Sequence, residues 1–212
     1  MRKKFKGIFG KEKIMEYAIK EITKTKELLG KTIEFGYNPK TDSLIEWTII
    51  AQDKEKILIW SKEIISQKTF SDVLHKDDLN LYKNSNVRKY LNEEFIKVFS
   101  KSEKEFIVDN SKDLIYILSE DDLKRYLSID YHKENEVLRA KPNGLLFSEG
   151  FETNESGYGK YWLKNFDSRH DYASIVDSFG NITRAKIDNK NVGIRPAIWI
   201  KKDRMHKLIE EK

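Results

Sequence analysis

Apolar and polar residues alternate along two parts of the chain, and helical patterns lie between them. An alternation with a period of two predicts half-buried strands, and a short, continuous apolar run predicts a fully buried strand. The strand-like runs are residues 31–39, 44–52, 56–61, 113–119, 160–165, 171–178, 181–188 and 192–200. The polar residues 53–55 and the triplet Phe179-Gly180-Asn181 each predict a turn between two neighbouring strands.

The helical patterns fall in four places. Residues 11–29 repeat apolar side chains at helical spacing, and Gly30 fits the end of that helix. This apolar stripe favours a helix that packs on the domain over an independent coiled coil. After Ser85, a typical N-cap, one helical face carries Val87, Leu91, Phe95 and Val98.

Two further helix starts are predicted from capping residues. Ser102, with Glu105 three positions later, has the pattern of a capping box. Ser119 precedes Asp121 and Asp122, which suit the first turn of a helix because the helix dipole favours negative charge there. Between this helix and the late strands, residues 129–160 are rich in turn formers and predict long surface loops, which are often functional.

Length and composition predict a single main domain. With 212 residues and a net charge of +5, the chain divides into a basic arm and amphipathic helix (1–29), a domain (30–200) and a charged tail (201–212). The absence of cysteine excludes disulfides, thiolate metal sites and a cysteine nucleophile. No apolar run reaches the roughly 18 residues of a membrane span, and no secretory signal is present, so cytoplasmic residence is expected.

The order of several short motifs resembles that of a known group of domains. The motifs are IEWTII (45–50), NVRKYLNEEF (86–95), IYILS (115–119), KYWLKN (160–165), YASIVDSFGNI (172–182) and GIRPAIWI (193–200). Together they resemble an uncharacterised bacterial family with WWLRS-type and GVRPA-type strands, which is similar to the C-type-lectin-like and formylglycine-generating-enzyme-like fold group. The resemblance implies an α+β fold of small twisted antiparallel sheets with two or three helices and long loops, to which the N-terminal helix is added.

The segment NVGIRPAIWI (191–200) sets a charge and a proline inside an apolar run. The resemblance implies that this last strand pairs beside the first strand. We expect Gly193 to permit a close backbone approach or a bulge, and Pro196 to occupy a position without a ladder partner. Arg195 has five donors and is interpreted as a structural clamp on irregular loops, with ligand binding as the alternative.

The chain lacks the residues that most classes of catalytic and metal-binding site require. Formylglycine-generating relatives hold copper with cysteines, which this chain does not contain. Calcium-dependent sugar binding is not expected, because Lys141-Pro142-Asn143 offers an ammonium where calcium needs an oxygen. The histidines, which form no metal-spaced pair, are His75, His132, His170 and His206. Ser168, His170 and Asp171 are too close in sequence for a triad. We therefore expect no catalytic residues, no metal and no cofactor.

Aromatic and basic residues gather between positions 158 and 172. Trp162 is expected in the core, with Tyr161 and Leu163 on the opposite face of the strand. Tyrosine, tryptophan and arginine dominate many protein interfaces, so the others are candidates for contact with a partner. These candidates are Tyr158, Lys160, Lys164, Phe166, Arg169, His170 and Tyr172. The alternative is that the cluster consists of core residues and an ordinary rim.

Three functions compete. The first is a non-enzymatic module that recognises a protein partner, in the setting of a mobile-element or phage-derived inhibitor of a larger host complex such as a CRISPR effector. The second is binding of nucleic acid or a ribonucleoprotein through the basic N-terminal arm, with Phe5 and Phe9 among its cations. The third is an enzyme whose site the motifs do not disclose.

Overall fold

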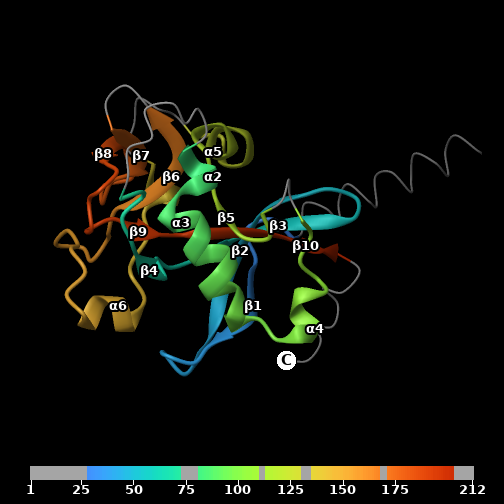
Figure 1. Ribbon diagram of the computed structural model, residues 1–212. Coiled ribbons are helices and arrows are strands. Elements are labelled where there is room, and N and C mark those ends of the chain that lie inside the picture. The colour runs from blue at the N-terminus through green and yellow to red at the C-terminus, as the bar shows by residue number, and fades with distance from the viewer. Residues whose placement is uncertain (1–27, 73–80, 110–112, 130–134, 168–170, 203–212) are drawn as a thin grey trace, which may run out of the picture.

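Two five-stranded sheets form the framework of the protein, seen in a computed structural model that describes residues 28–72, 81–109, 113–129, 135–167 and 171–202 (Figure 1). The first sheet contains, in spatial order, β1 (Thr32–Asn38), β2 (Ser43–Gln52), β3 (Lys56–Ser61), β10 (Pro196–Lys201) and β5 (Tyr116–Ile117). The second contains β4 (Ser66–Gln67), β9 (Gly193–Ile194), β6 (Tyr161–Asp167), β7 (Tyr172–Val176) and β8 (Ile182–Lys186).

The helical segments are all short. They are α2 (Leu81–Asn84), α3 (Asn86–Lys89), the π-helix η1 (Tyr90–Glu94), the 3-10 helix η2 (Phe95–Val98), α4 (Lys101–Lys104), α5 (Glu120–Leu127), the 3-10 helix η3 (Glu136–Leu138) and α6 (Gly144–Ser148). The α+β class is thereby confirmed. Two finer expectations are wrong. The helical segments outnumber the two or three predicted, and the second sheet contains a parallel pairing, in which β6 meets β9 at Tyr161 and Gly193.

Both predicted turns are confirmed, and each has a local chemical cause. At the β2–β3 turn, Oδ1 of Asp53 accepts hydrogen bonds from the backbone N–H groups of Glu55 and Lys56, both at 2.9 Å. At the β7–β8 turn, Gly180 has φ of 87°, a conformation that other residues rarely adopt. These hairpins were predictable because short polar turns act through adjacent residues.

The capping predictions are confirmed at two sites and wrong at the third. Ser85 and Ser119 accept hydrogen bonds from the backbone N–H groups three residues later. The third cap is Ser100 with Glu103, two positions before the predicted pair Ser102 and Glu105. The reason is tertiary, because Oε1 of Glu103 also accepts a hydrogen bond from the N–H of Gly36 in β1, at 2.9 Å.

Asn92 ties the π-helix to the strand region beside it. Its Oδ1 accepts hydrogen bonds from the backbone N–H groups of Leu114 and Ile115, at 3.0 and 3.2 Å. Its Nδ2 donates to the carbonyl oxygens of Ile115 and Arg88, at 2.8 and 3.1 Å. One amide side chain thus supplies four bonds, and the irregular helical turn aims it at its backbone partners.

We expect the substitution Asn92→Ala to lower the free energy of unfolding by about 2 kcal/mol, because it leaves half-buried backbone groups without partners. Denaturant titration measures this loss. Asn191→Ala is the control, since Asn191 is an exposed residue of the turn before β9, and its effect should stay within about 0.5 kcal/mol. Equal effects of the two substitutions would contradict the role given to Asn92.

The last strand is an interior strand of the first sheet, the fourth of five, rather than an edge strand. The expectation that it pairs beside the first strand is wrong, because β10 lies between β3 and β5 and β1 is an edge strand. Residues 196–200 are all buried, whereas β1 has exposed positions at both ends. A strand that is apolar on both faces needs cover on both sides, which the centre of the sheet provides.

Two chain segments pass together from one sheet to the other. β9 and β10 form one nearly continuous ribbon across the molecule, interrupted only at Arg195 (Figure 1). The segment from β3 to β4 runs antiparallel to it, because β3 pairs with β10 and β4 pairs with β9. The sheets therefore share a junction, and Arg195 lies in it.

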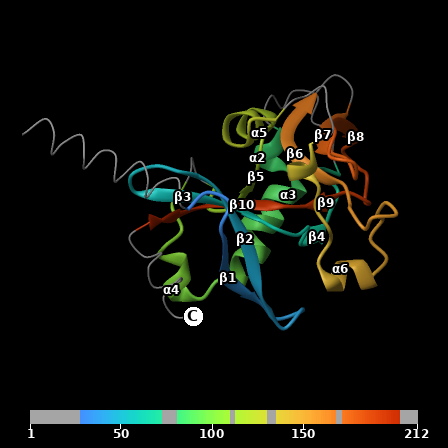
Figure 2. The same cartoon turned by 180° about the vertical axis from the view of Figure 1, so that it is seen from behind.

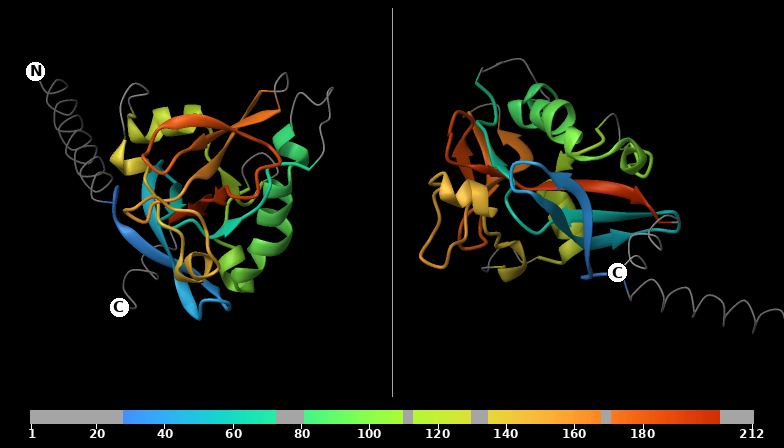
Figure 3. Two further views of the ribbon diagram at one scale, coloured as in Figure 1. Left: turned by 90° about the vertical axis from the view of Figure 1, so that its left-hand side faces the viewer. Right: turned by 90° about the horizontal axis from the view of Figure 1, so that it is seen from below.

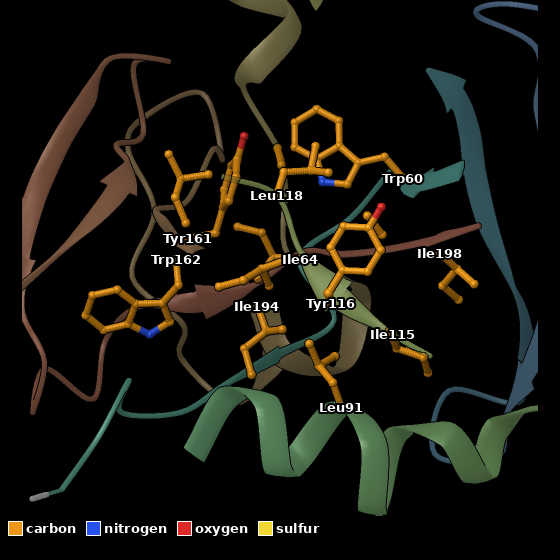
Figure 4. Close-up of a cluster of buried hydrophobic side chains, with 14 of the residues drawn as sticks. Trp60, Ile64, Leu91, Ile115, Tyr116, Leu118, Tyr161, Trp162, Ile194 and Ile198 are labelled. Atoms are coloured by element: carbon orange, nitrogen blue, oxygen red, sulfur yellow. The ribbon is translucent and has the colours of Figure 1, made fainter. Parts of the chain in front are cut away.

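The core is continuous across this junction. Figure 4 shows Ile64 and Ile194 between side chains of the second sheet, such as Trp162, and side chains of the first, such as Ile198, with Leu91 of the π-helix beneath them. Tyr161, Trp162 and Leu163 are all buried, so β6 begins as a strand that is covered on both faces.

The two ends of the chain are not described. The predicted helix 11–29 lies outside the described residues except for its last two positions, and so does most of the tail 201–212. Gly30 has φ of 81°, which is compatible with the predicted helix end. Among the described residues, no helix has both the length and the apolar character required to span a bilayer.

Candidate functional site

Arg195 connects three segments at the junction of the sheets. Its Nε donates to the carbonyl oxygen of Ser61 at 2.8 Å, at the end of β3. One terminal nitrogen donates to the carbonyl oxygen of Leu138 and to the hydroxyl of Tyr161, both at 3.2 Å. The guanidinium also stacks on Trp60, with its carbon 3.3 Å from the ring centroid. Arg195 therefore holds a loop, a strand end and a strand start in one position.

Burial governs the ionisation of this group. Arg195 is 6% exposed, and among the described residues no carboxylate forms an ion pair with it. Burial lowers the pKa of Arg195 and raises the pKa of Tyr161 to about 12. The Tyr161 hydroxyl therefore stays neutral and donates to the Leu138 carbonyl oxygen at 2.6 Å. A group surrounded in this way is structural and is not open to a ligand.

Three loops meet at the side of the second sheet, next to this junction (Figure 3, left). Nδ2 of Asn154 donates to the carbonyl oxygen of Ser178 at 2.7 Å, and its Oδ1 accepts from the N–H of Tyr158 at 3.0 Å. Nε of Arg139 donates to the carbonyl oxygen of Phe179 at 3.0 Å. Side chains thus fasten the loops 135–142, 151–160 and 177–181 to one another.

Gly180 allows two of these loops to come together. A Cβ atom at this position would lie 2.4 Å from the carbonyl oxygen of Asn135, so any side chain would push the loops apart. The N–H of Asn135 lies 3.4 Å from the carbonyl oxygen of Gly180. Close backbone contact, together with the side-chain bonds, makes this surface a preformed one.

Exposed apolar groups lie on these loops beside cations. Val137 and Phe179 are 54% and 52% exposed. The ring of Tyr158 lies near two cations, with the guanidinium carbon of Arg139 5.9 Å and the Nζ of Lys141 5.4 Å from its centroid. We call these five residues, Val137, Arg139, Lys141, Tyr158 and Phe179, the loop face.

The structure separates the partner-binding candidates into two groups. Tyr158 and Lys160 precede β6, whereas Lys164 and Phe166 lie further along the strand, and Phe166 is opposite Ala173. Six residues of strand span roughly 20 Å. Tyr172 begins β7 opposite Asp167, at the same end as Phe166. Arg169 and His170 lie outside the described residues.

The two candidate lysines are engaged within the fold. Lys160 forms an ion pair with Glu152 at 2.9 Å. The Nζ of Lys164 lies 4.7 Å from the ring centroid of Tyr82 and 5.5 Å from that of Tyr116. Lys164 thereby links β6 to α2 and β5, and its ammonium is directed at buried tyrosines.

Two residues that were predicted to be structural have close contacts inside the protein. Trp162 is fully buried, and its Nε1 donates to the carbonyl oxygen of Lys68 at 2.8 Å. Gly193 donates its N–H to the carbonyl oxygen of Lys160 at 2.9 Å, and a Cβ at Gly193 would lie 2.2 Å from Cγ2 of Ile64.

Four residues of the loop face were not among the predicted partner-binding residues, namely Val137, Arg139, Lys141 and Phe179. Phe179 was recognised only as part of a turn. An exposed phenylalanine at the tip of a short polar turn was the available signal, because turn tips are surface positions. Val137 carried no such signal, because a single apolar residue in a loop is as often buried as exposed.

A groove borders the loops on the side of α6. It has a volume of about 510 Å³ and is lined by residues of the β1–β2 turn, the segment after β3 and α6, including Lys40, Leu44, Glu63 and Asn143. A neighbouring groove of about 370 Å³ shares Lys40 and Asn143 and extends to Tyr90. Burial, followed by the nearby Glu46, raises the pKa of Glu63. Lys40 and Glu63 are the charged residues that line the first groove.

The described residues contain no cluster of three or more histidine, aspartate or glutamate side chains that could hold a metal ion. Asn143 belongs to the Lys-Pro-Asn triplet 141–143, at which calcium binding is not expected. Its Oδ1 caps α6 by accepting a hydrogen bond from the N–H of Leu146 at 2.8 Å. Asp122 caps its own helix by accepting from the N–H of Ser119 at 2.9 Å. These polar groups serve local structure.

Comparison with known proteins yields one match. A family model described as "Domain of unknown function (DUF6273)" matches residues 54–202, which is more than half of the chain. The match begins within the β2–β3 turn, so β1 and the whole of β2 lie before it, although they complete the same sheet. No curated protein and no solved structure matches the chain.

Proposed function

Since the chain belongs to the DUF6273 family, whose function is unknown, we propose from its geometry that it is a non-enzymatic module that recognises a protein partner through the loop face. The observation that carries this proposal is the pair of half-exposed apolar side chains, Val137 and Phe179, on loops that are fastened to each other. A preformed surface loses little conformational entropy when it binds. Aromatic and arginine side chains such as Tyr158 and Arg139 are typical of the centres of such interfaces.

A crosslinking experiment tests this assignment. A photoreactive phenylalanine analogue at position 179 is expected to capture a partner from host lysate, and the variant Val137→Asp should reduce the yield at least tenfold, because a charge would be buried in the contact. Leu44 is the matched control site, since it is 51% exposed but lines the groove beside α6. Capture of the same partner from position 44 and not from 179 would assign recognition to the groove instead.

The finer features of the proposal come from the resemblance and from composition. We propose that the fold belongs to the C-type-lectin-like group, in which loop variation on one side of a scaffold suits recognition. The proposed setting is cytoplasmic, where the protein, as a mobile-element or phage-derived inhibitor, docks on a larger host complex such as a CRISPR effector. The same crosslinking experiment identifies the complex if this setting is right.

A further inference from the structure

A second surface lies at the far end of the first sheet from the second sheet. There the β2–β3 turn and the end of β10 lie side by side (Figure 2), and Tyr126 at the end of α5 packs against Trp199 of β10. The backbone N–H of Lys202 donates to the carbonyl oxygen of Glu55 at 2.7 Å, which joins the turn to the end of β10. We call the cations of this surface the cationic end, and they are Lys54, Lys56, Arg125, Lys201 and Lys202.

Two of these lysines are directly opposite each other. Lys56 and Lys201 pair across β3 and β10, so their side chains leave the sheet on the same face. Like charges at such a position destabilise a sheet. Among the described residues, no carboxylate forms an ion pair with Lys56, Lys201 or Arg125. An anion bound between the lysines would remove the repulsion.

The nearby carboxylates do not neutralise this surface. The β2–β3 turn contributes Asp53 and Glu55, and Asp122 of α5 lies near Tyr126, against the five cations. Asp53 lies near Lys56 and Lys202 and offsets part of their charge. The surface therefore keeps a positive charge.

Aromatic rings lie among the cations. The Nζ of Lys56 is 4.7 Å from the ring centroid of Trp199, and the Trp199 and Tyr126 rings are 6.2 Å apart. Trp199 is mostly buried and supports Lys56 from below, whereas Tyr126 is half-buried and keeps part of its ring accessible. The guanidinium carbon of Arg125 lies 5.5 Å from the Tyr126 ring centroid.

The described part of the chain begins close to this surface. Residues 1–27 contain nine lysines and arginines against four glutamates. They join the domain at Leu28, and the N–H of Gly30 donates to the carbonyl oxygen of Ile49 in β2 at 2.8 Å. Ile49 is three residues, or about 10 Å of strand, before Gln52 at the end of β2.

We propose that the cationic end binds single-stranded nucleic acid, with phosphates at Lys56, Lys201 and Arg125 and a base stacked on Tyr126. Proteins that bind single strands without sequence preference place cations along the phosphate backbone of the nucleic acid and stack its bases on aromatic rings. This site is separate from the loop face and does not depend on the function proposed for it.

Fluorescence anisotropy with 20-nucleotide single-stranded DNA and RNA, measured over a salt series on the full chain, tests the proposal. The triple variant Lys56→Gln, Lys201→Gln, Arg125→Gln is expected to bind at least tenfold more weakly at low salt and to lower the slope of log K against log salt by about 2, since each lost phosphate contact removes about 0.7. The control carries the same charge change at three exposed lysines elsewhere, as Lys83→Gln, Lys186→Gln, Lys190→Gln, and should retain most of the affinity.

Tyr126→Leu separates stacking from charge. It is expected to weaken binding of single strands about fivefold and to leave the salt slope unchanged. Circular dichroism of each variant verifies that it folds.

Four outcomes would overturn the proposal. These are the absence of binding by the unmodified chain at low salt, equal losses in the cationic-end and control variants, and loss of binding only when Arg2, Lys3, Lys4 and Lys6 are replaced by glutamine. The fourth is binding to phosphatidylserine vesicles without binding to nucleic acid, which would assign the surface to a membrane.

Discussion

Replacement of Arg195 by methionine is expected to lower the free energy of unfolding by about 3 kcal/mol, a large effect for a single side chain. Methionine fills a similar volume but removes the donor to the carbonyl oxygen of Ser61 and leaves the carbonyl oxygen of Leu138 with the Tyr161 hydroxyl alone. It also removes the stacking of the guanidinium on Trp60. Relief of the buried charge offsets part of this loss.

Thermal unfolding measures the effect of Arg195→Met, and in a chain of this size a loss of this magnitude corresponds to a decrease of about 6–12 °C in Tm. The Tm of Arg195→Lys should lie between those of the unmodified protein and Arg195→Met, because lysine keeps the charge but cannot stack and donate in one plane. Arg184→Met is the matched control, since the Arg184 side chain is 62% exposed. If Arg195→Met and Arg184→Met melt at the same temperature, the clamp interpretation of Arg195 is wrong.

Replacement of Gly193 by alanine is also expected to have a large effect, lowering the free energy of unfolding by about 2–3 kcal/mol. The added Cβ would lie 2.2 Å from Cγ2 of Ile64 and 3.2 Å from the carbonyl oxygen of Lys160. Neither neighbour can move freely, because Ile64 is fully buried and the Lys160 carbonyl accepts the N–H of Gly193 itself. The pairing of β9 with β6 must therefore open to admit the methyl group.

Gly144→Ala is the control for Gly193→Ala. Gly144 begins α6, and a Cβ there has no heavy atom within 4 Å, so alanine should be neutral or slightly stabilising. A double-mutant cycle with Ile64→Ala locates the clash. The double variant should be more stable than the sum of the two single losses predicts by at least about 1 kcal/mol. If the losses of the two single variants simply add, the clash caused by Gly193→Ala does not involve Ile64.

Comparison of the two glycines shows how far sequence reasoning reaches. Gly193 stands inside an apolar strand, where a glycine indicates a bulge or a close approach, and this close approach was expected. The atoms that approach Gly193 were not predictable, because Ile64 and Lys160 are far from it in the chain. Gly180 was assigned to a turn from its neighbours alone, but its contact with Asn135 became visible only in three dimensions.

The candidate site was less accessible to sequence reasoning than the fold. Tyr158 and Lys160 were grouped with Phe166 and Tyr172 because they are close in sequence, yet an extended strand carries residues apart rather than together. The loop face instead combines residues from three loops, and the cationic end combines a turn, a strand end and a helix. Proximity of this kind has no signature along the chain.

The features that follow from the sequence are local: the hairpins, the caps at Ser85 and Ser119, the buried start of β6, the buried β10, and the α+β class. Period, turn chemistry and capping act between residues that are a few positions apart, so a single chain displays them. Only long-range packing determined that β10 is an interior strand of its sheet, that the helix at Ser100 starts two residues early, and which segments Arg195 connects. Those outcomes depend on which buried surfaces and backbone groups find partners from distant segments, and that choice is made only when the whole core packs.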